Sequence, residues 1–203
     1  MNGSPSLALA AIVLAAGLSR RMGRPKMLLP WRETTVLGRV AKTLAESGVQ
    51  EIVIVTGGER PAVEAEAAQL AQFLPVRTVF NPHYESGEMM SSLRVGLAAL
   101  GAEIQAALIA PGDQPQLSLE SARKMVSTWQ TTGARLLVPS FKRRRGHPWL
   151  VRREMWPELA QAETARAFLN THADEILYVE CDETVLKDLD TPEDYARDLQ
   201  NAV

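Results

Sequence analysis

Short runs of apolar residues alternate along the chain with longer segments in which apolar residues recur every three or four positions. The short runs are typical of buried strands, and the longer period is typical of amphipathic helices. Strands are predicted over residues 8–14, 51–56, 76–80, 106–110, 135–139 and 176–181. Helices are predicted over residues 36–46, 61–72, 91–100, 119–131 and 192–201, with a broken pair within 153–170. This alternation predicts an α/β fold, a three-layer αβα Rossmann-like arrangement with a mainly parallel sheet.

The 203 residues, with 46% hydrophobic content, are enough to build one globular domain around a continuous core. No internal repeat, low-complexity tract or long linker divides the sequence, so residues 1–203 are predicted to form a single domain. Ligands of open parallel sheets bind beyond the carboxyl ends of the strands. The segments in those places are residues 15–26, 56–59, 81–92, 111–115 and 140–148.

The net charge of -2 gives the chain no overall attraction to nucleic acid or to an anionic membrane. An anionic ligand must therefore meet local basic clusters, and two stand out at residues 20–26 and 142–145. The only cysteine, Cys181, excludes an internal disulfide and suits a reducing cytoplasm. No Lys or Arg precedes the apolar run at 7–16, which is interpreted as a strand rather than a signal peptide. No stretch approaches the roughly 20 apolar residues that span a bilayer.

The first candidate segment, residues 14–26, reads Leu-Ala-Ala-Gly-Leu-Ser-Arg-Arg-Met-Gly-Arg-Pro-Lys. Small residues let backbone N–H groups approach phosphate oxygens, while Arg and Lys side chains neutralise the phosphate charge. The spacing from Gly17 to Gly23 and Lys26 matches neither the P-loop nor the G-x-G-x-x-G pattern. The alternative interpretation is a tight turn followed by a solvated basic loop.

This segment resembles the signature of the MobA-like nucleotidyltransferases, L-A-[AG]-G-x-S-x-R-M-G-x-x-K, at every fixed position. The resemblance implies a fold of the nucleotide-diphospho-sugar transferase type and a loop that wraps a triphosphate. Phosphate and nucleotide contacts are then expected from Gly17, Ser19, Arg21, Gly23 and Lys26. The small residues nearest the base would be Leu14, Ala15 and Ala16.

A second motif places Asp113 immediately after a strand, between Gly and Pro residues. Mg²⁺ is typically held by one or two carboxylates together with substrate phosphates, which suits Asp113. The alternative is an aspartate that caps a turn, the commoner role of Asp beside Gly. The resemblance favours the first interpretation, since the family's metal motif is G-D-x-P, and it places Gly112 beside the nucleotide.

The third motif, residues 188–195, contains a helix start in its second half. Thr191 is predicted to be the N-cap, Pro192 the first helical residue and Asp194 the reciprocal carboxylate of a capping box. This leaves Asp188 and Asp190 without a structural explanation. The family carries D-[IL]-D-T-P here, which implies that one of these two aspartates completes the metal site, and Asp190 is favoured.

Two further segments resemble family elements. Residues 81–92 contain an Asn, a Gly-Met region and a Ser before a helix, which implies nucleoside-facing roles for Gly87, Ser91 and Asn81, although Ser91 also suits an ordinary N-cap. Gly146 and His147 belong to a G-H-P element of the cytidylyl branch, where it borders the acceptor pocket. Arg145 precedes this element within a run of four basic residues that departs from the family pattern.

The resemblance spans residues 12–195 and points most closely to the molybdenum cofactor cytidylyltransferases. It implies a cytoplasmic, Mg²⁺-dependent enzyme that transfers CMP from CTP to the terminal phosphate of molybdenum-molybdopterin and has a molybdoenzyme partner. Arg21, Lys26 and Asp113 would be its catalytic residues. The alternatives are a cytidylyl or guanylyl transferase for a sugar phosphate or another phosphorylated metabolite, and a non-catalytic chaperone for a nucleotide-bearing cofactor.

Overall fold

The computed structural model describes residues 8–19, 22–86 and 89–201. In these ranges the main sheet has eight strands in the order β10-β7-β9-β6-β1-β4-β5, with β8 paired to β7. Strand β9 is antiparallel to both neighbours and β8 is antiparallel to β7, whereas the other pairs are parallel. The strands are β1 (Leu9–Ala15), β4 (Glu51–Thr56), β5 (Val76–Phe80), β6 (Ala106–Pro111), β7 (Leu136–Phe141), β8 (Arg144–Arg145), β9 (Trp149–Arg152) and β10 (Ile176–Glu180).

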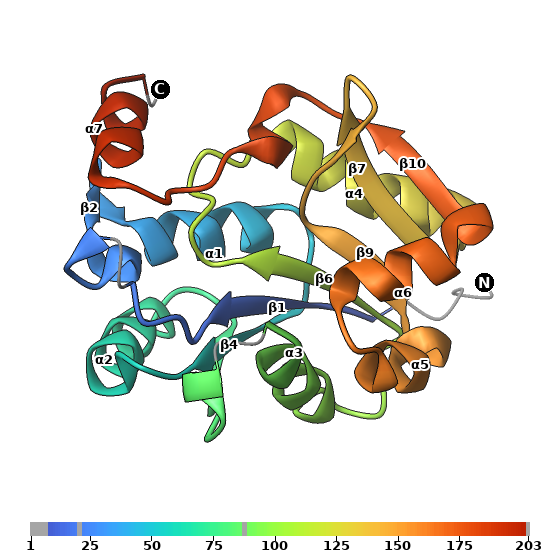
Figure 1. Cartoon of the computed structure of the whole chain (residues 1–203), viewed down its shortest axis with the longest axis horizontal. Coiled ribbons are helices and arrows are strands. Elements are labelled where there is room, and N and C mark those ends of the chain that lie inside the picture. The colour runs from blue at the N-terminus through green and yellow to red at the C-terminus, as the bar shows by residue number, and fades with distance from the viewer. Residues whose placement is uncertain (1–7, 20–21, 87–88, 202–203) are drawn as a thin grey trace.

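Helices cover both faces of the sheet, which confirms the predicted α/β fold with a mostly parallel central sheet (Figure 1). One face packs against α1 (Val36–Glu46), α2 (Arg60–Leu70) and α4 (Leu119–Thr132). The other face packs against α3 (Met89–Ala98), α5 (Trp156–Gln161) and α6 (Ala165–Thr171). No helix in the described ranges is both long enough and apolar enough to cross a bilayer.

Strand β1 lies at the centre of the sheet and is buried on both sides. Leu9, Ala11 and Val13 face one helical layer, and Ala10 and Ile12 face the other. This alternation follows from the two-residue period of a strand and explains why the run is apolar throughout.

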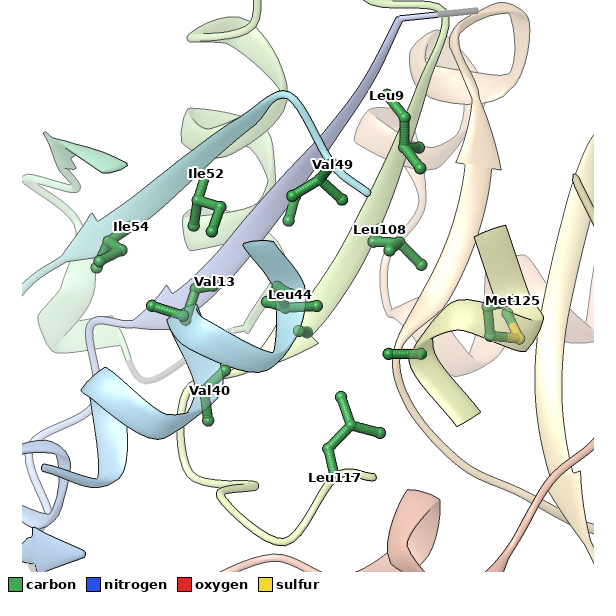
Figure 2. Packing of buried hydrophobic residues seen from close by; sticks show 14 of the residues in the cluster. Leu9, Val13, Val40, Leu44, Val49, Ile52, Ile54, Leu108, Leu117 and Met125 are labelled. Atoms are coloured by element: carbon green, nitrogen blue, oxygen red, sulfur yellow. The ribbon is translucent and has the colours of Figure 1, made fainter. Parts of the chain in front are cut away.

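The packing on the first face is seen in Figure 2, where sheet residues Val13, Ile52 and Leu108 lie beside Val40 and Leu44 of α1. These side chains are at most 1% exposed. Full burial of an aliphatic side chain stabilises the fold by about 2 kcal/mol. The face of the sheet that carries α1 is therefore a rigid support for the loops at its edge.

A third, smaller apolar cluster lies outside these two layers. It contains Leu29, Trp31 of β2 (Pro30–Trp31) and Leu189, and Tyr195 of α7 (Pro192–Asn201) packs against it. The hydroxyl of Tyr195 donates to the carbonyl oxygen of Pro30 at 2.5 Å. Figure 1 shows α7 beside β2, away from the main sheet. The cluster thus joins the segment after β1 to the C-terminal segment.

The predicted capping box at the start of α7 is confirmed. The N–H of Asp194 donates to Oγ1 of Thr191 at 3.1 Å, and the N–H of Thr191 donates to Oδ2 of Asp194 at 3.1 Å. The helix begins at Pro192, as predicted. Two backbone donors that a helix start leaves unpaired are satisfied in this way.

Four short strands in the described ranges were not predicted. β9 (Trp149–Arg152) fills the gap between β6 and β7, and a two-strand sheet forms from β2 and β3 (Thr34–Thr35). Strand β8 forms where the basic run was expected to be a loop. Each element has two to four residues, so neither a two-residue nor a 3.6-residue period can be seen in it.

Asp182 is the N-cap of the 3-10 helix η6 (Glu183–Leu186), in which the carbonyl oxygen of Val185 accepts a hydrogen bond from the N–H of His147. Its carboxylate accepts hydrogen bonds from the hydroxyls of Ser118 and Ser121 and from the N–H of Thr184. Partial burial would raise the pKa of Asp182, but the hydrogen bonds from Ser118, Thr184 and Ser121 outweigh it and hold the pKa below its ordinary value. The folded state therefore favours the ionised form.

We expect Asp182→Asn to lower the free energy of unfolding at pH 7 by about 1 kcal/mol, because an amide cannot accept all of these hydrogen bonds. Since the folded pKa lies below the ordinary value of 3.8, the contribution is present above that pH and is lost as the pH falls through the folded pKa. Urea unfolding at several pH values measures the difference.

Glu183→Gln is the matched control, because Glu183 pairs with Lys187 on the exposed surface. Its effect should stay within about 0.5 kcal/mol. An equal loss in both variants would contradict the anchoring role of Asp182.

Candidate active site

Three segments that are far apart in the sequence meet at the carboxyl edge of the sheet. The Nζ atom of Lys26, in the segment after β1, donates a hydrogen bond to Oδ2 of Asp113, which follows β6. The same Nζ atom donates to the carbonyl oxygen of Leu189 at 3.2 Å and lies 3.9 Å from Oδ1 of Asp190. The structure therefore brings together the predicted lysine and two of the predicted aspartates.

Backbone hydrogen bonds hold these groups in position. Lys26 begins the 3-10 helix Lys26–Leu28, and its N–H donates to Oγ of Ser19 at 3.1 Å. The φ angle of Ser19 is 48°, in the left-handed region, so the chain turns sharply at this residue. On the opposite side, the N–H of Leu189 donates to the carbonyl oxygen of Asp113 at 3.0 Å. The C-terminal segment is thus tied directly to the loop after β6.

Gly112 allows a close approach between the loops after β1 and β6. Its N–H donates to the carbonyl oxygen of Leu14 at 3.0 Å, which extends the pairing of the two strands by one bond. A Cβ atom at Gly112 would lie 3.0 Å from Sδ of Met27 and 3.1 Å from the oxygen of Leu14. A side chain at this position would therefore require Met27 or the end of β1 to shift by a few tenths of an ångström.

The carboxylates form a negatively charged group. The pKa of Asp188 is raised by desolvation and by the charges of Asp190 and Asp113. In the described part of the chain, no three His, Cys, Asp or Glu side chains are arranged so that they could hold a metal ion. Two carboxylates completed by substrate phosphates are a common arrangement for Mg²⁺, and Asp113 and Asp190 fit it.

A cleft of about 240 Å³ opens beside this group. Five predicted site residues line it: Leu14, Ala16, Gly17, Lys26 and Asp113. The other five lining residues were not predicted as site residues from the sequence: Met27, Tyr84, Met89, Ser92 and Pro111. An aromatic residue three positions after Asn81, in a segment that follows a strand, was the available signal for Tyr84.

Gly57, which follows β4, lies between Ala16 and Tyr84, two residues that line the cleft. A Cβ atom at Gly57 would lie 2.5 Å from the carbonyl oxygen of Ala16 and 2.7 Å from Cβ of Tyr84. The N–H of Gly58 donates to the same oxygen of Ala16 at 3.2 Å. The position of Ala16 relative to Tyr84 therefore depends on a residue without a side chain.

Asn81 is fully buried, and its side chain organises the segment before α3. Its amide nitrogen donates to the hydroxyls of Ser91 and Ser92 at 2.9 and 3.0 Å, and its oxygen accepts from the N–H of His83 at 2.9 Å. Asn81 thus holds Ser91 in place, while Ser92 reaches the cleft wall.

Two further predicted residues do not line the cleft, and two others lie outside the described residues. Ala15 is buried at the end of β1, and Gly23 adopts a φ of 63°. Arg21 and Gly87 lie outside the described residues, so their roles stay predictions.

Gly146 and His147 are positioned by η6. A Cβ atom at Gly146 would lie 2.3 Å from the carbonyl oxygen of Val185, and the N–H of His147 donates to that oxygen at 2.9 Å. The His147 ring stacks on Trp149 with a centroid distance of 4.7 Å. Burial lowers the pKa of His147 to about 4, although the charge of Asp113 opposes this shift. His147 is therefore a neutral imidazole at pH 7.

Arg145 is tied to the outer edge of the sheet. Its Nε atom donates to the hydroxyl of Tyr178 at 2.9 Å, and its Nη1 atom donates to Oδ1 of Asn170 at 3.0 Å. The turn between β7 and β8 consists of Lys142 and Arg143, with φ angles of 49° and 64°. Two positive φ angles are typical of the tight turns that close β-hairpins, so the basic run forms a hairpin at the cleft edge of the sheet.

Comparisons with known proteins agree with this arrangement. The sequence profile of the MobA-like NTP transferase domain matches residues 11–177. Nicotine blue oxidoreductase of Paenarthrobacter nicotinovorans is 33% identical, over 92% of this chain and 94% of its own. Molybdenum cofactor cytidylyltransferase of Escherichia coli (strain K12) is 27% identical, over 93% of this chain and 94% of its own.

A solved structure of Rv0371c from Mycobacterium tuberculosis H37Rv has a TM-score of 0.80 at 29% identity, over 96% of this chain and 100% of that chain. Its complex with manganese has a TM-score of 0.75 at 28% identity, over 95% of this chain and 98% of that chain.

The sheet, the lysine and carboxylate group and these similarities define an enzyme of the nucleotidyltransferase class. The MobA-like profile covers more than half of the chain, which shows the family within this class. The chain belongs to the MobA-like NTP transferase family.

We expect Gly57→Ala to weaken nucleotide binding by about tenfold or more, because the new methyl group separates Ala16 from Tyr84. The same overpacking should lower the free energy of unfolding by about 1–3 kcal/mol. Calorimetric titration with nucleotide and urea unfolding measure the two effects.

Gly17→Ala is the matched control for stability, because a Cβ atom at Gly17 would meet no described atom within 4 Å. Equal free energies of unfolding for the Gly57 and Gly17 variants would contradict the prediction, because they would show that Ala16 and Tyr84 move apart without destabilising the fold.

Proposed function

We propose that the chain transfers CMP from CTP to the terminal phosphate of molybdenum-molybdopterin and releases pyrophosphate, with Mg²⁺ as the metal. The observation that carries this proposal is the meeting of Lys26, Asp113 and Asp190 at one end of a cleft whose wall is the first signature loop. A cation and two carboxylates beside a loop of small residues suit a metal-bound triphosphate.

The chemistry needs positioning more than proton transfer. A phosphate monoester is already largely ionised at pH 7, so the acceptor requires alignment with the α-phosphorus rather than a general base. Mg²⁺ held by Asp113 and Asp190 would supply neutralisation of the phosphate charge. Lys26 is assigned to the departing pyrophosphate, and Arg21 is assigned to the same task from the sequence alone.

The nucleotide is assigned to the cleft side of β1. Backbone N–H groups from Gly17 to Ser19 would meet the triphosphate, and the base would lie near Ala16. Tyr84 is added to this assignment because it lines the cleft opposite Ala16. Ser91 and Gly87 remain candidates for the nucleoside.

The acceptor is assigned to Arg145, Gly146 and His147. His147 lies close enough to Asp113 for the aspartate charge to affect its pKa. A neutral imidazole contributes hydrogen bonds rather than charge, so the charge attraction for an anionic acceptor falls to the basic hairpin. Molybdopterin as the acceptor is supported by the name of the Escherichia coli relative. A molybdoenzyme is the corresponding candidate partner to receive the product.

Other functions make different predictions. A transferase for a sugar phosphate would keep the same nucleotide site with another acceptor, and a cofactor chaperone would bind without turnover. The 33% identity to nicotine blue oxidoreductase makes a redox reaction a further candidate. A redox reaction would not release pyrophosphate from CTP.

The decisive assay incubates the purified protein with Mg²⁺, each NTP in turn and a panel of phosphorylated acceptors that includes molybdenum-molybdopterin. We expect pyrophosphate release from CTP only when molybdopterin is present. Release with a sugar phosphate instead would replace the acceptor, and no release with any pair would refute a transferase function.

We expect Asp113→Asn to reduce turnover by at least 100-fold while changing the free energy of unfolding by no more than about 1 kcal/mol. The reason is that the change removes the charge of a proposed metal ligand while keeping the size of the side chain, so the packing is unaltered. Asp174→Asn, at an exposed position of the 3-10 helix η5 (Ala173–Glu175), is the control and should retain full turnover. Normal turnover in the Asp113 variant would refute the metal assignment.

We expect the native protein to prefer CTP to GTP, because Ala16 narrows the base region where the guanylyl branch of the family has a second glycine. Ala16→Gly should relax this preference while preserving activity with CTP. Competition between the two nucleotides in one reaction measures the ratio of kcat/KM values. Equal or greater use of GTP by the native protein would contradict the assignment.

A further inference from the structure

The ammonium group of Lys26 lies among the groups assigned to the metal. It contacts Oδ2 of Asp113, donates to the carbonyl oxygen of Leu189 at 3.2 Å and lies 3.9 Å from Oδ1 of Asp190. The side chains of Lys26 and Asp113 are each only 15% exposed, so water screens their attraction less than it screens a surface pair. Lys26 is thus the counter-ion of Asp113 and Asp190, the two carboxylates that we assign to the metal.

A divalent cation and this ammonium group compete for Oδ2 of Asp113. Mg²⁺ binds oxygen ligands at about 2.0–2.1 Å, and an ammonium group within hydrogen-bond distance of the same oxygen would lie only a few ångströms from it. Two cations at that distance repel each other. Metal binding at Asp113 is therefore opposed by Lys26 in its present position and is favoured when Lys26 moves away.

The structure provides a route for this movement. The backbone of Lys26 is fixed by its hydrogen bond to Ser19 and by the 3-10 helix Lys26–Leu28. The side chain, however, also lines the 240 Å³ cleft and has a flexible four-carbon stem. It can turn from the carboxylates to an anion in the cleft without a change in the fold.

We propose that Lys26 is an exchangeable counter-cation that competes with divalent metal for Asp113 and Asp190 until a nucleotide arrives. The triphosphate then attracts Lys26 into the cleft and frees the carboxylates, so metal and nucleotide enter as one unit. This inference rests on the proposed function, because it requires Asp113 to be a metal ligand. It adds that the lysine keeps metal affinity low in the nucleotide-free protein.

The small number of protein ligands also indicates that metal binds together with the nucleotide rather than before it. In the ranges described here, no cluster of three or more His, Cys, Asp or Glu side chains could hold a metal. Phosphate oxygens of the nucleotide would have to complete the coordination. A free metal ion thus meets both an incomplete ligand set and a competing ammonium group.

The test measures binding of Mn²⁺ alone to the nucleotide-free protein, from the paramagnetic resonance signal of unbound Mn²⁺. We expect Lys26→Met to tighten Mn²⁺ binding on the order of tenfold, the lower end of the 1–3 pKa units by which one neighbouring charge shifts a carboxylate equilibrium. Lys26→Arg keeps the charge and should remain as weak as the native protein.

Two controls separate this inference from the metal assignment. Lys42→Met removes an exposed lysine that pairs with Glu46 on α1 and should leave Mn²⁺ affinity unchanged. Asp113→Asn, combined with Lys26→Met in one protein, should abolish the increase in Mn²⁺ affinity that Lys26→Met gives alone. These results would support the competition.

If Lys26→Met binds Mn²⁺ no more tightly while binding still depends on Asp113, the competition is refuted and the metal site stands. If Asp113→Asn leaves Mn²⁺ binding unchanged in both backgrounds, the metal assignment fails and the competition fails with it. An equal gain in Lys42→Met would attribute the effect to net charge and would also refute the proposal.

Discussion

The site depends on the register between β1 and β6. These two buried strands pair in parallel from Leu9 with Ala106 to Leu14 with Pro111. The loops that carry Lys26 and Asp113 therefore start from adjacent positions, although 87 residues separate the two side chains in the sequence. A slip of one residue would turn every side chain of β1 to the opposite face, and both apolar layers oppose such a slip.

The segment with Asp188 and Asp190 is held at the site by the small apolar cluster rather than by the main sheet. Asp188 and Asp190 flank Leu189, which is fully buried in the small cluster with Leu29 and Trp31. Leu189 thus fixes the chain at the point where its two polar neighbours lie near Lys26 and Asp113. The loop with Lys26 and the segment with Asp190 pack through the same cluster, so a disturbance of one is transmitted to the other.

The parts of this structure that could be predicted from the sequence are those specified by local pattern. The mainly parallel sheet, the capping box at Thr191 and the placement of Lys26 and Asp113 at one edge of the sheet follow from periodicity, from N-cap chemistry and from the position of each residue after a predicted strand. The position of Tyr84 depends on the close approach permitted by Gly57, and the partners of Arg145 lie on β10 and α6. These contacts join distant segments, so neither spacing nor composition reveals them.

Strand β9 has a consequence for how this edge of the sheet is built. The parallel strands β1 and β6 place at this edge the residues that follow them, but β9 is antiparallel to β6, so it places there the residues that precede it, Gly146 and His147. One group of residues thus comes from strand ends and the other from a strand beginning. The two groups have no loop in common, so an insertion in one loop leaves the other loop unchanged. Such a division would allow the segment to which we assign the acceptor to diversify during evolution while the loop after β1 is retained.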